Sequence, residues 1–367
     1  MTPRERALTI LSGRQPDQVP WFADLDYLAL SQVKQGLKPE GFVRSREYID
    51  WHRELGVGFY LQGFLPLREI HAECGISVRT EGNLRIREIA TQEGSLREIW
   101  QWMPSSYSEA PREYLVKQPE DLRAYRAFIR DTRFEADFEF ARHRTEQIGD
   151  AGILVTYTPR TPFMQLLVQD SGIENLMTIF ADTREELEAT LEEAAVRYTE
   201  AVEIVAGGPG DVVMIPENLS SEMVGPAFFA RYMRDVQSRW SQLIRDAAKH
   251  SCIHMDGTLR GLLREEAGVG LSFIEACTPA PVGDLAVQEW PHYIDGVQTI
   301  LWGGLPGVYF TEKVTQEEFD RFILDEILPV MRSAPRYVLG VADQVPPDGL
   351  ESRVMRVRDL VDAHGTY

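Results

Sequence analysis

The chain has 367 residues, 44% of them hydrophobic and 26% charged, which is enough to bury a core of the usual globular kind. Its 57 acidic residues exceed its 38 basic residues and give a formal net charge of −19. Such a surface repels phosphate backbones, and no basic stripe with interleaved aromatic residues occurs, so we expect no nucleic-acid partner.

Three widely spaced cysteines, Cys74, Cys252 and Cys277, do not indicate a disulfide framework. The first residues carry charges where a secretory signal needs an apolar core, and no run approaches the ~18 apolar residues that span a bilayer. We therefore expect a cytoplasmic protein without a membrane segment. The oligomeric state is left open.

Short apolar, β-branched runs recur along the chain and alternate with longer amphipathic stretches. Near-continuously apolar runs are typical of buried parallel strands. We predict eight of them, at residues 19–23, 57–61, 153–157, 212–215, 252–254, 273–277, 299–302 and 337–341. Eight strands with helical crossovers predict an α/β fold, a (β/α)8 TIM barrel that forms one domain over residues 1–367.

Two helices between these strands are predicted from their amino-terminal residues. The sequence Asp182-Thr183-Arg184-Glu185 predicts a capped helix with apolar positions at helical spacing from Leu187 onward. The sequence Thr315-Gln316-Glu317-Glu318 predicts a second capping box, ahead of Phe319.

The connection between the second and third strands is much longer than the others. Residues 76–102 alternate polar and apolar side chains, with turn signals at 81–83 and 93–95, and predict a β-meander. Helical sequence follows over residues 119–148. An insertion of this size in a βα loop is typical of a lid over the barrel mouth.

Polar residues follow several of the predicted strands, where barrel enzymes place their active sites. The candidates are Asp24 and Asp26, Gln62, Tyr157, Glu217, His254 and Asp256, Glu275, and Asp343. Four of these, His254, Asp256, Asp343 and Glu217, form a plausible ligand set for a divalent metal. Strand alternation puts His254 and Asp256 on one face, with Cα atoms about 6.5–7 Å apart.

Each of these residues also has a purely structural interpretation. A histidine at a strand end is often held by hydrogen bonds alone, and Glu217 can be a buried carboxylate bonded to Asn218 or to backbone amides. Asp24 can line the pocket or cap a helix. Cys252, one step deeper than His254, is a candidate core residue.

Several segments together resemble the uroporphyrinogen decarboxylase superfamily over nearly the whole chain. The segments 4–8, 11–13 and 17–21 are similar to its opening R-x-x-L-x-x-L-x-G-x-x-x-D-R-V-P pattern. Segments 273–279, 283–284 and 339–347 resemble its later strands, the last with a Pro-containing turn. The resemblance implies a barrel enzyme.

The decarboxylase branch of that superfamily gathers the carboxylates of a tetrapyrrole with arginines near its amino terminus and uses an aspartate after the second strand. Here residues 22–26 read Phe-Ala-Asp-Leu-Asp, and Tyr60-Leu61-Gln62 has no carboxylate. Asp24 and Asp26 would repel a polyanionic porphyrinogen, so this substrate is disfavoured.

The cobamide-dependent methyltransferase branch is the more similar one. It binds zinc with a His-x-Cys-Gly motif and a later cysteine, and transfers a methyl group from a corrinoid protein to a thiol. His254 and Gly257 match this motif, whereas Asp256 and Asp343 stand at or near the two cysteine positions. Oxygen ligands in place of thiolates make a harder site, in which a bound thiolate would be less nucleophilic.

The leading hypothesis is therefore a metal-dependent methyltransferase-like enzyme. His254, Asp256 and Asp343, with Glu217 as a further ligand, would hold zinc or another divalent ion, and a corrinoid protein would be the partner. Tyr157 and Asp24 would line the pocket, and Glu275 would be a general base. The alternatives are a decarboxylase or lyase acting on a small carboxylate substrate other than uroporphyrinogen, and a non-catalytic binding barrel.

Overall fold

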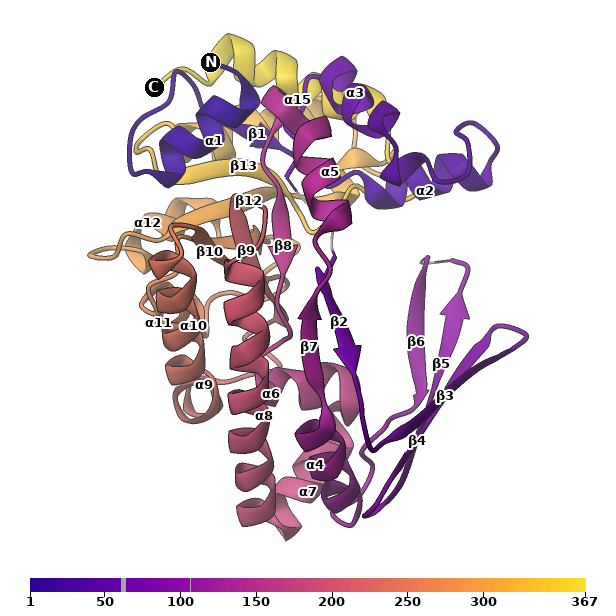
Figure 1. Cartoon of the computed structure of the whole chain (residues 1–367). Helices are drawn as coiled ribbons and strands as arrows, with labels where there is room; N and C mark the ends of the chain where they lie inside the picture. The colour runs from indigo at the N-terminus through magenta and orange to yellow at the C-terminus, as the bar shows by residue number, and fades with distance from the viewer. Residues whose placement is uncertain (61–63, 106) are drawn as a thin grey trace. The chain divides into compact units, whose positions relative to one another are not determined.

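A computed structural model describes residues 1–60, 64–105 and 107–367 of the chain (Figure 1). These residues divide into two compact units. The first unit comprises residues 1–64, 138–157 and 209–367, and the second comprises residues 65–137 and 158–208. One domain over residues 1–367 stays a prediction, because compact units of this kind can belong to one domain or to two.

The first unit contains a seven-stranded parallel sheet in the order β1-β13-β12-β11-β10-β9-β8. Its strands are β1 (Trp21–Phe22), β8 (Val155–Tyr157), β9 (Val212–Leu219), β10 (His250–Met255), β11 (Phe273–Cys277), β12 (Ile300–Pro306) and β13 (Tyr337–Ala342). Every residue of β11 and β13 is buried, as the near-continuous apolar runs predict. Seven of the eight predicted strands are thus confirmed, although their ends differ by up to four residues.

The segment predicted as the second strand makes only isolated contacts in its described part. Phe22 pairs with Gly58, and Phe59 pairs with Gly152, each through a single parallel bridge, whereas Leu61 lies outside the described residues. A Cβ atom on Gly152 would lie 1.7 Å from the carbonyl oxygen of Phe59, so this approach requires glycine. The structure shows a mixed α/β fold with a seven-stranded parallel sheet, and the eight-stranded barrel stays a prediction.

Aromatic and aliphatic side chains from successive strands pack against one face of this sheet. Trp302 is fully buried at the centre, and its ring centroid lies 5.0 Å from that of Phe22, 4.7 Å from Tyr60 and 5.1 Å from Phe273. Cys252 belongs to the same buried cluster. This core supports the polar residues that follow along the same strands.

The helices of the first unit follow or connect these strands. They are α1 (Pro3–Leu11), α2 (Asp26–Lys34), α3 (Arg46–Leu55), α5 (Glu139–Ile148), α9 (Pro226–Tyr232), α10 (Arg234–Asp246), α11 (Leu263–Ala267), α12 (Trp290–Tyr293), α13 (Gln316–Arg321), α14 (Leu328–Met331) and α15 (Glu351–His364). The capping box at the start of α13 is confirmed, because Thr315 and Glu318 each accept the backbone N–H of the other. Within the described ranges, no helix has the length and apolar character that crossing a membrane requires.

The second unit contains an antiparallel sheet in the order β3-β4-β5-β6, visible in Figure 1. Its strands are β3 (Gly75–Glu81), β4 (Leu84–Thr91), β5 (Gly94–Met103) and β6 (Ser108–Glu113), so the predicted meander is confirmed and gains a fourth strand. A separate pair, β2 (Leu67–Ile70) and β7 (Arg133–Ala136), also runs antiparallel. The continuous helical stretch predicted over 119–148 is therefore wrong at β7, which separates α4 (Asp121–Asp131) from α5.

The remaining helices of this unit are α6 (Pro162–Met164), α7 (Gly172–Asp182) and α8 (Arg184–Ala206). The predicted helix start near Asp182 is confirmed, but the capping interaction is not. Asp182 ends α7, and Thr183 precedes α8 without a side-chain capping bond. The preceding helix occupies the residues that the local pattern assigns to a cap.

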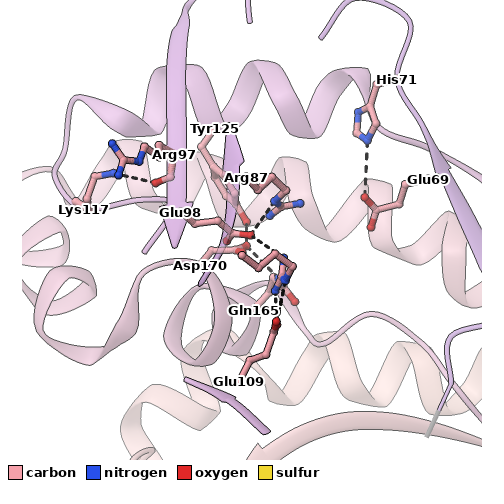
Figure 2. Close-up of polar contacts among 11 residues, drawn as sticks. Glu69, His71, Arg87, Arg97, Glu98, Glu109, Lys117, Tyr125, Gln165 and Asp170 are labelled. Atoms are coloured by element: carbon pink, nitrogen blue, oxygen red, sulfur yellow. Dashed lines mark hydrogen bonds and ion pairs between the residues drawn. The ribbon is translucent and has the colours of Figure 1, made fainter. Parts of the chain in front are cut away.

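A buried polar network lies inside the second unit, and Figure 2 shows its contacts. Asp170 accepts hydrogen bonds from the Tyr125 hydroxyl at 2.5 Å and the Gln165 amide at 3.1 Å. Nearby, Arg87 donates to the buried carboxylate of Glu98 at 2.8 Å. Burial raises the pKa of Asp170 from its ordinary 3.8 to about 6, because the hydrogen bonds and the charge of Arg87 offset the loss of solvation only in part.

This raised pKa predicts a pH-dependent loss of stability. Between pH 4 and 6 the carboxyl group is ionised in the unfolded chain but still protonated in the folded one, so stability falls as the pH rises through this window. In Asp170→Asn this loss disappears, because asparagine does not titrate, while its amide oxygen can still accept the Tyr125 hydrogen bond. We expect the free energy of unfolding of the wild type, relative to D170N, to fall by on the order of 2–3 kcal/mol from pH 4 to pH 7.

Urea unfolding at several pH values measures this difference. The matched control is Asp137→Asn, an exposed aspartate of the same unit, which should leave the pH dependence of the wild type unchanged. A difference between wild type and D170N that stays constant with pH would contradict the shifted pKa.

Candidate active site

His254 and Glu275 face each other because of the register of β10 and β11. They are partners in the parallel ladder, and each lies two residues beyond a core residue, Cys252 and Phe273 respectively. Nδ1 of His254 lies 2.6 Å from Oε2 of Glu275. Glu275 is fully buried and His254 is 9% exposed, so this contact is shielded from water.

Asp343, which follows β13, lies on the other side of the imidazole. Its Oδ1 is 3.9 Å from Nε2 of His254, and its side chain is 51% exposed. Its backbone has φ +74°, a conformation that residues with a side chain rarely adopt. The charge of Asp256 acts on both His254 and Asp343, so these three predicted site residues lie within electrostatic reach of one another.

Tyr60 completes a chain of hydrogen bonds behind the histidine. Its hydroxyl donates to Oε1 of Glu275 at 2.7 Å, and the side chain is fully buried. Both carboxyl oxygens of Glu275 are therefore engaged, one by Tyr60 and one by His254. On this segment the sequence pattern pointed to Gln62, which lies outside the described residues, and gave no signal for Tyr60.

Asp24 and Tyr157 lie near the same group of charges. Burial is the main cause that raises the pKa of Asp24 well above its ordinary value, followed by repulsion from Asp26 and then from Asp343 and Glu275. Burial likewise raises the pKa of Tyr157, followed by the charges of Glu275 and Asp24. Both residues thus lie within electrostatic reach of Glu275.

Asp24 also has the structural role that the sequence left open. Its Oδ1 accepts the backbone N–H of Asp26 at 2.8 Å, at the start of α2, and its carbonyl oxygen accepts from the backbone of Val345 at 3.0 Å. Asp26 in turn accepts the Tyr48 hydroxyl at 2.6 Å. These contacts hold Asp24 in a fixed orientation.

The acidic surroundings determine the protonation of His254. Burial alone lowers its pKa, but attraction to Glu275 and the hydrogen bond to it outweigh that effect, with further help from Asp256 and Asp343. Together these interactions raise the pKa of His254 to about 9. The ring is therefore an imidazolium at neutral pH, with a proton on each nitrogen.

Glu217 is fully buried, and its described contacts lie elsewhere. The Gln237 amide of α10 donates to its Oε1 at 3.2 Å, and its charge acts on Glu266 of α11. The pairing of β9 with β10 is irregular between Ile215 and Leu219, so these contacts, and not simple strand alternation, place Glu217 against the helices. The contacts described for Glu217 are therefore with α10 and α11.

Metal-ligand geometry is incomplete in this arrangement. Among the residues that the structure describes, no group of three or more His, Cys, Asp or Glu side chains lies close enough to hold a metal ion. The arrangement as it stands can donate a proton from His254, hold that ring through Glu275 and Tyr60, and attract a cation with Asp256 and Asp343.

Comparisons with known proteins give a structural likeness only. No family profile and no curated protein sequence matches the chain. A solved methyltransferase from Methanosarcina mazei is similar in structure, with TM-score 0.65 and 14% identity over 99% of each chain. A 3-dehydroquinate dehydratase from Geobacillus kaustophilus HTA426 has TM-score 0.31 and 12% identity, over 62% of this chain and 74% of that one. At such low identity the first match shows a shared fold, and the second is too dissimilar in structure to show one.

The dependence of His254 on Glu275 can be tested in the metal-free protein. In Glu275→Gln the charge that favours the imidazolium is removed, so we expect the pKa of His254 to fall from about 9 toward its ordinary 6.5, by about one unit or more. NMR titration of the imidazole resonances measures this shift. In the control Tyr60→Phe the charge of Glu275 remains, and the pKa should change far less. An unchanged pKa in E275Q would show that Glu275 does not govern the ring.

Proposed function

We propose that this chain is a methyltransferase-like enzyme that acts at the carboxyl ends of β10, β11 and β13. One observation carries the proposal: Glu275 holds Nδ1 of His254 at 2.6 Å, and Nε2 faces Asp343 at 3.9 Å. The fold shared with the methyltransferase from Methanosarcina mazei over 99% of both chains supports it. The proposal includes membership of the uroporphyrinogen decarboxylase superfamily and closure of the sheet into an eight-stranded barrel.

We propose further that His254, Asp256 and Asp343 bind a divalent metal ion, with zinc as the first choice. A carboxylate on the far nitrogen of a histidine is a common support for a metal-binding ring, and Glu275 is such a support. Two ligands of a tetrahedral zinc ion lie about 3.3 Å apart, so a movement of less than 1 Å in the 3.9 Å separation of His254 and Asp343 would suit them.

The chemistry and the placement of His254, Asp256 and Asp343 fit a bound metal ion in part. One imidazole and two carboxylates suit zinc or a harder ion, and the excess of acidic groups favours a bound cation. Against this, Nε2 must lose its proton first, and the hydrogen bond described for Glu217 is with Gln237 of α10. We therefore propose three protein ligands and leave Glu217 out.

A bound ion of this kind supplies Lewis acidity and lowers the pKa of a coordinated thiol or water. The chain itself supplies orientation and proton control. Glu275, with both oxygens engaged, acts as a positioning residue for His254 rather than as the general base. Asp24, whose pKa burial raises well above its ordinary value, would be a proton donor to a substrate, and Tyr157 would line the same region. A small corrinoid protein remains the proposed methyl donor.

Elemental analysis of the purified protein tests the metal site directly. We expect about one equivalent of zinc per chain in the wild type, and its loss in His254→Ala and Asp343→Asn. The matched control is Glu217→Gln, which should keep the metal because Glu217 faces α10 and α11. Full metal content in H254A would exclude the proposed ligand set.

Activity is tested by methyl transfer from methylcobalamin to a small thiol, followed by the change in the cobalamin spectrum. We expect H254A to reduce kcat/KM by about 100-fold or more, and E217Q to change it little. Wild-type activity equal to that of H254A would contradict the proposal.

A second candidate is a metal-independent lyase, such as a decarboxylase of a small carboxylic acid. The Tyr60–Glu275–His254 hydrogen-bond chain favours it, because a protonated imidazole held in this way is a ready general acid. Carbon dioxide release from candidate acids, measured with chelator-treated protein, tests it. Release that survives chelation but is lost in His254→Gln would favour the lyase, and release that requires added metal would exclude it.

A further inference from the structure

A cavity of about 500 Å³ lies in the first unit, at the ends of the strands opposite His254. Its lining comes from the ends of α1 and α10 and from the residues that precede or begin β11, β12 and β13. Ser272 directly precedes β11, Ile300 begins β12, and Arg336 directly precedes β13. Since parallel strands share one direction, this is the amino end of the sheet, whereas His254 lies at the carboxyl end.

Two guanidinium groups line this cavity, those of Arg245 and Arg336. Each donates to backbone carbonyls: Arg245 to Gly270 at 3.3 Å, and Arg336 to Thr299 at 3.0 Å and to Val297. The hydrogen bonds described for both groups are with backbone carbonyls, and none of the described residues that line the cavity is acidic. In a chain of net charge −19 this is a local concentration of uncompensated positive charge.

The remaining lining combines hydroxyl groups with apolar surface. Ser12 and Ser272 supply the hydroxyls, and Arg14, beside the cavity, donates to the Ser12 hydroxyl at 3.0 Å and adds a third cation. Leu271 and Ile300 supply apolar surface. A cavity of several hundred Å³ that is lined by apolar side chains and a few polar groups is typical of small-molecule sites.

We propose that this cavity is a second ligand site, which binds a small organic anion. The anionic head, a phosphate or a carboxylate, contacts the outward N–H groups of Arg245 and Arg336, and the body of the ligand packs on Leu271 and Ile300. Guanidinium groups suit this role because their planar N–H groups match two oxygens of one anion and stay charged at any physiological pH. An inorganic ion alone would leave most of the cavity unfilled.

Isothermal titration at low ionic strength tests the proposal with three probes. Phenyl phosphate combines a phosphate head with an apolar body, benzoate combines a carboxylate head with the same body, and inorganic phosphate has no body. We expect one molecule of phenyl phosphate or benzoate to bind per chain at millimolar concentration or below, and inorganic phosphate to bind more weakly. Whichever of phenyl phosphate and benzoate binds more tightly identifies the anionic head group that the site prefers.

Arg245→Gln is the main variant, because Arg245 is exposed and its single described bond, to a backbone carbonyl, is long. It should weaken binding by about tenfold or more. Arg239→Gln is the matched control: it removes the same charge from an exposed position on α10 outside the cavity, and it should leave the affinity unchanged. Arg336→Gln tests the second cation, with the melting temperature measured beside it, since Arg336 also holds two backbone carbonyls.

His254→Ala separates this site from the proposed active site, and it should bind phenyl phosphate as the wild type does. Three results would each overturn the proposal: no binding of either organic probe to the wild type at millimolar concentration, equal affinity in R245Q and wild type, or loss of binding in H254A.

Discussion

The contact between His254 and Glu275 is the interaction on which the candidate site depends. It exists because β10 and β11 pair in one register, so that two residues of opposite charge meet at the same level of the sheet. A shift of one residue would turn Glu275 to the other face of the sheet and leave the imidazole without its partner. The apolar residues that precede each of them keep that register, since Cys252 and Phe273 are both in the core.

This contact also organises the charges around it. Glu275 holds the ring so that Nε2 faces Asp343, and Tyr60 holds Glu275 in turn. The result is one imidazole among several carboxyl groups, with burial and mutual repulsion raising the pKa of Asp24. Such a group is stable only with protons on some of its members or with a cation among them, and the two proposed functions differ in which of these occurs.

The two ends of the sheet in the first unit differ in charge. Acidic groups gather around His254 at the carboxyl ends, whereas Arg245 and Arg336 line a cavity at the amino ends. Arg245 is exposed and Arg336 half-buried, and the hydrogen bonds described for both are with backbone carbonyls. A bound anion would balance the positive charge that they bring to this end of the sheet.

The sequence by itself determined where most strands of the parallel sheet lie and which residues end them. Continuous apolar runs are a local property, so the predicted bounds of β10, β11 and β13 lie close to the observed ones. His254, Glu275 and Asp343 were therefore correctly predicted to lie at or just beyond the ends of these strands. The meander was predicted equally well, because the alternation of polar and apolar residues and the turn residues are also local features. Short polar strands such as β6 and β7 were missed, since they form only by pairing with a partner elsewhere in the chain.

Only the tertiary structure decided which of the candidate residues share one place. Glu217 lies in a core strand as His254 does, but its carboxylate accepts a hydrogen bond from Gln237 of α10. Tyr60 belongs to no sequence motif. It supports the site because its hydroxyl donates a hydrogen bond to Glu275, a residue 215 positions away in the chain. Side-chain direction and long-range pairing depend on how separate segments pack, which no local pattern encodes.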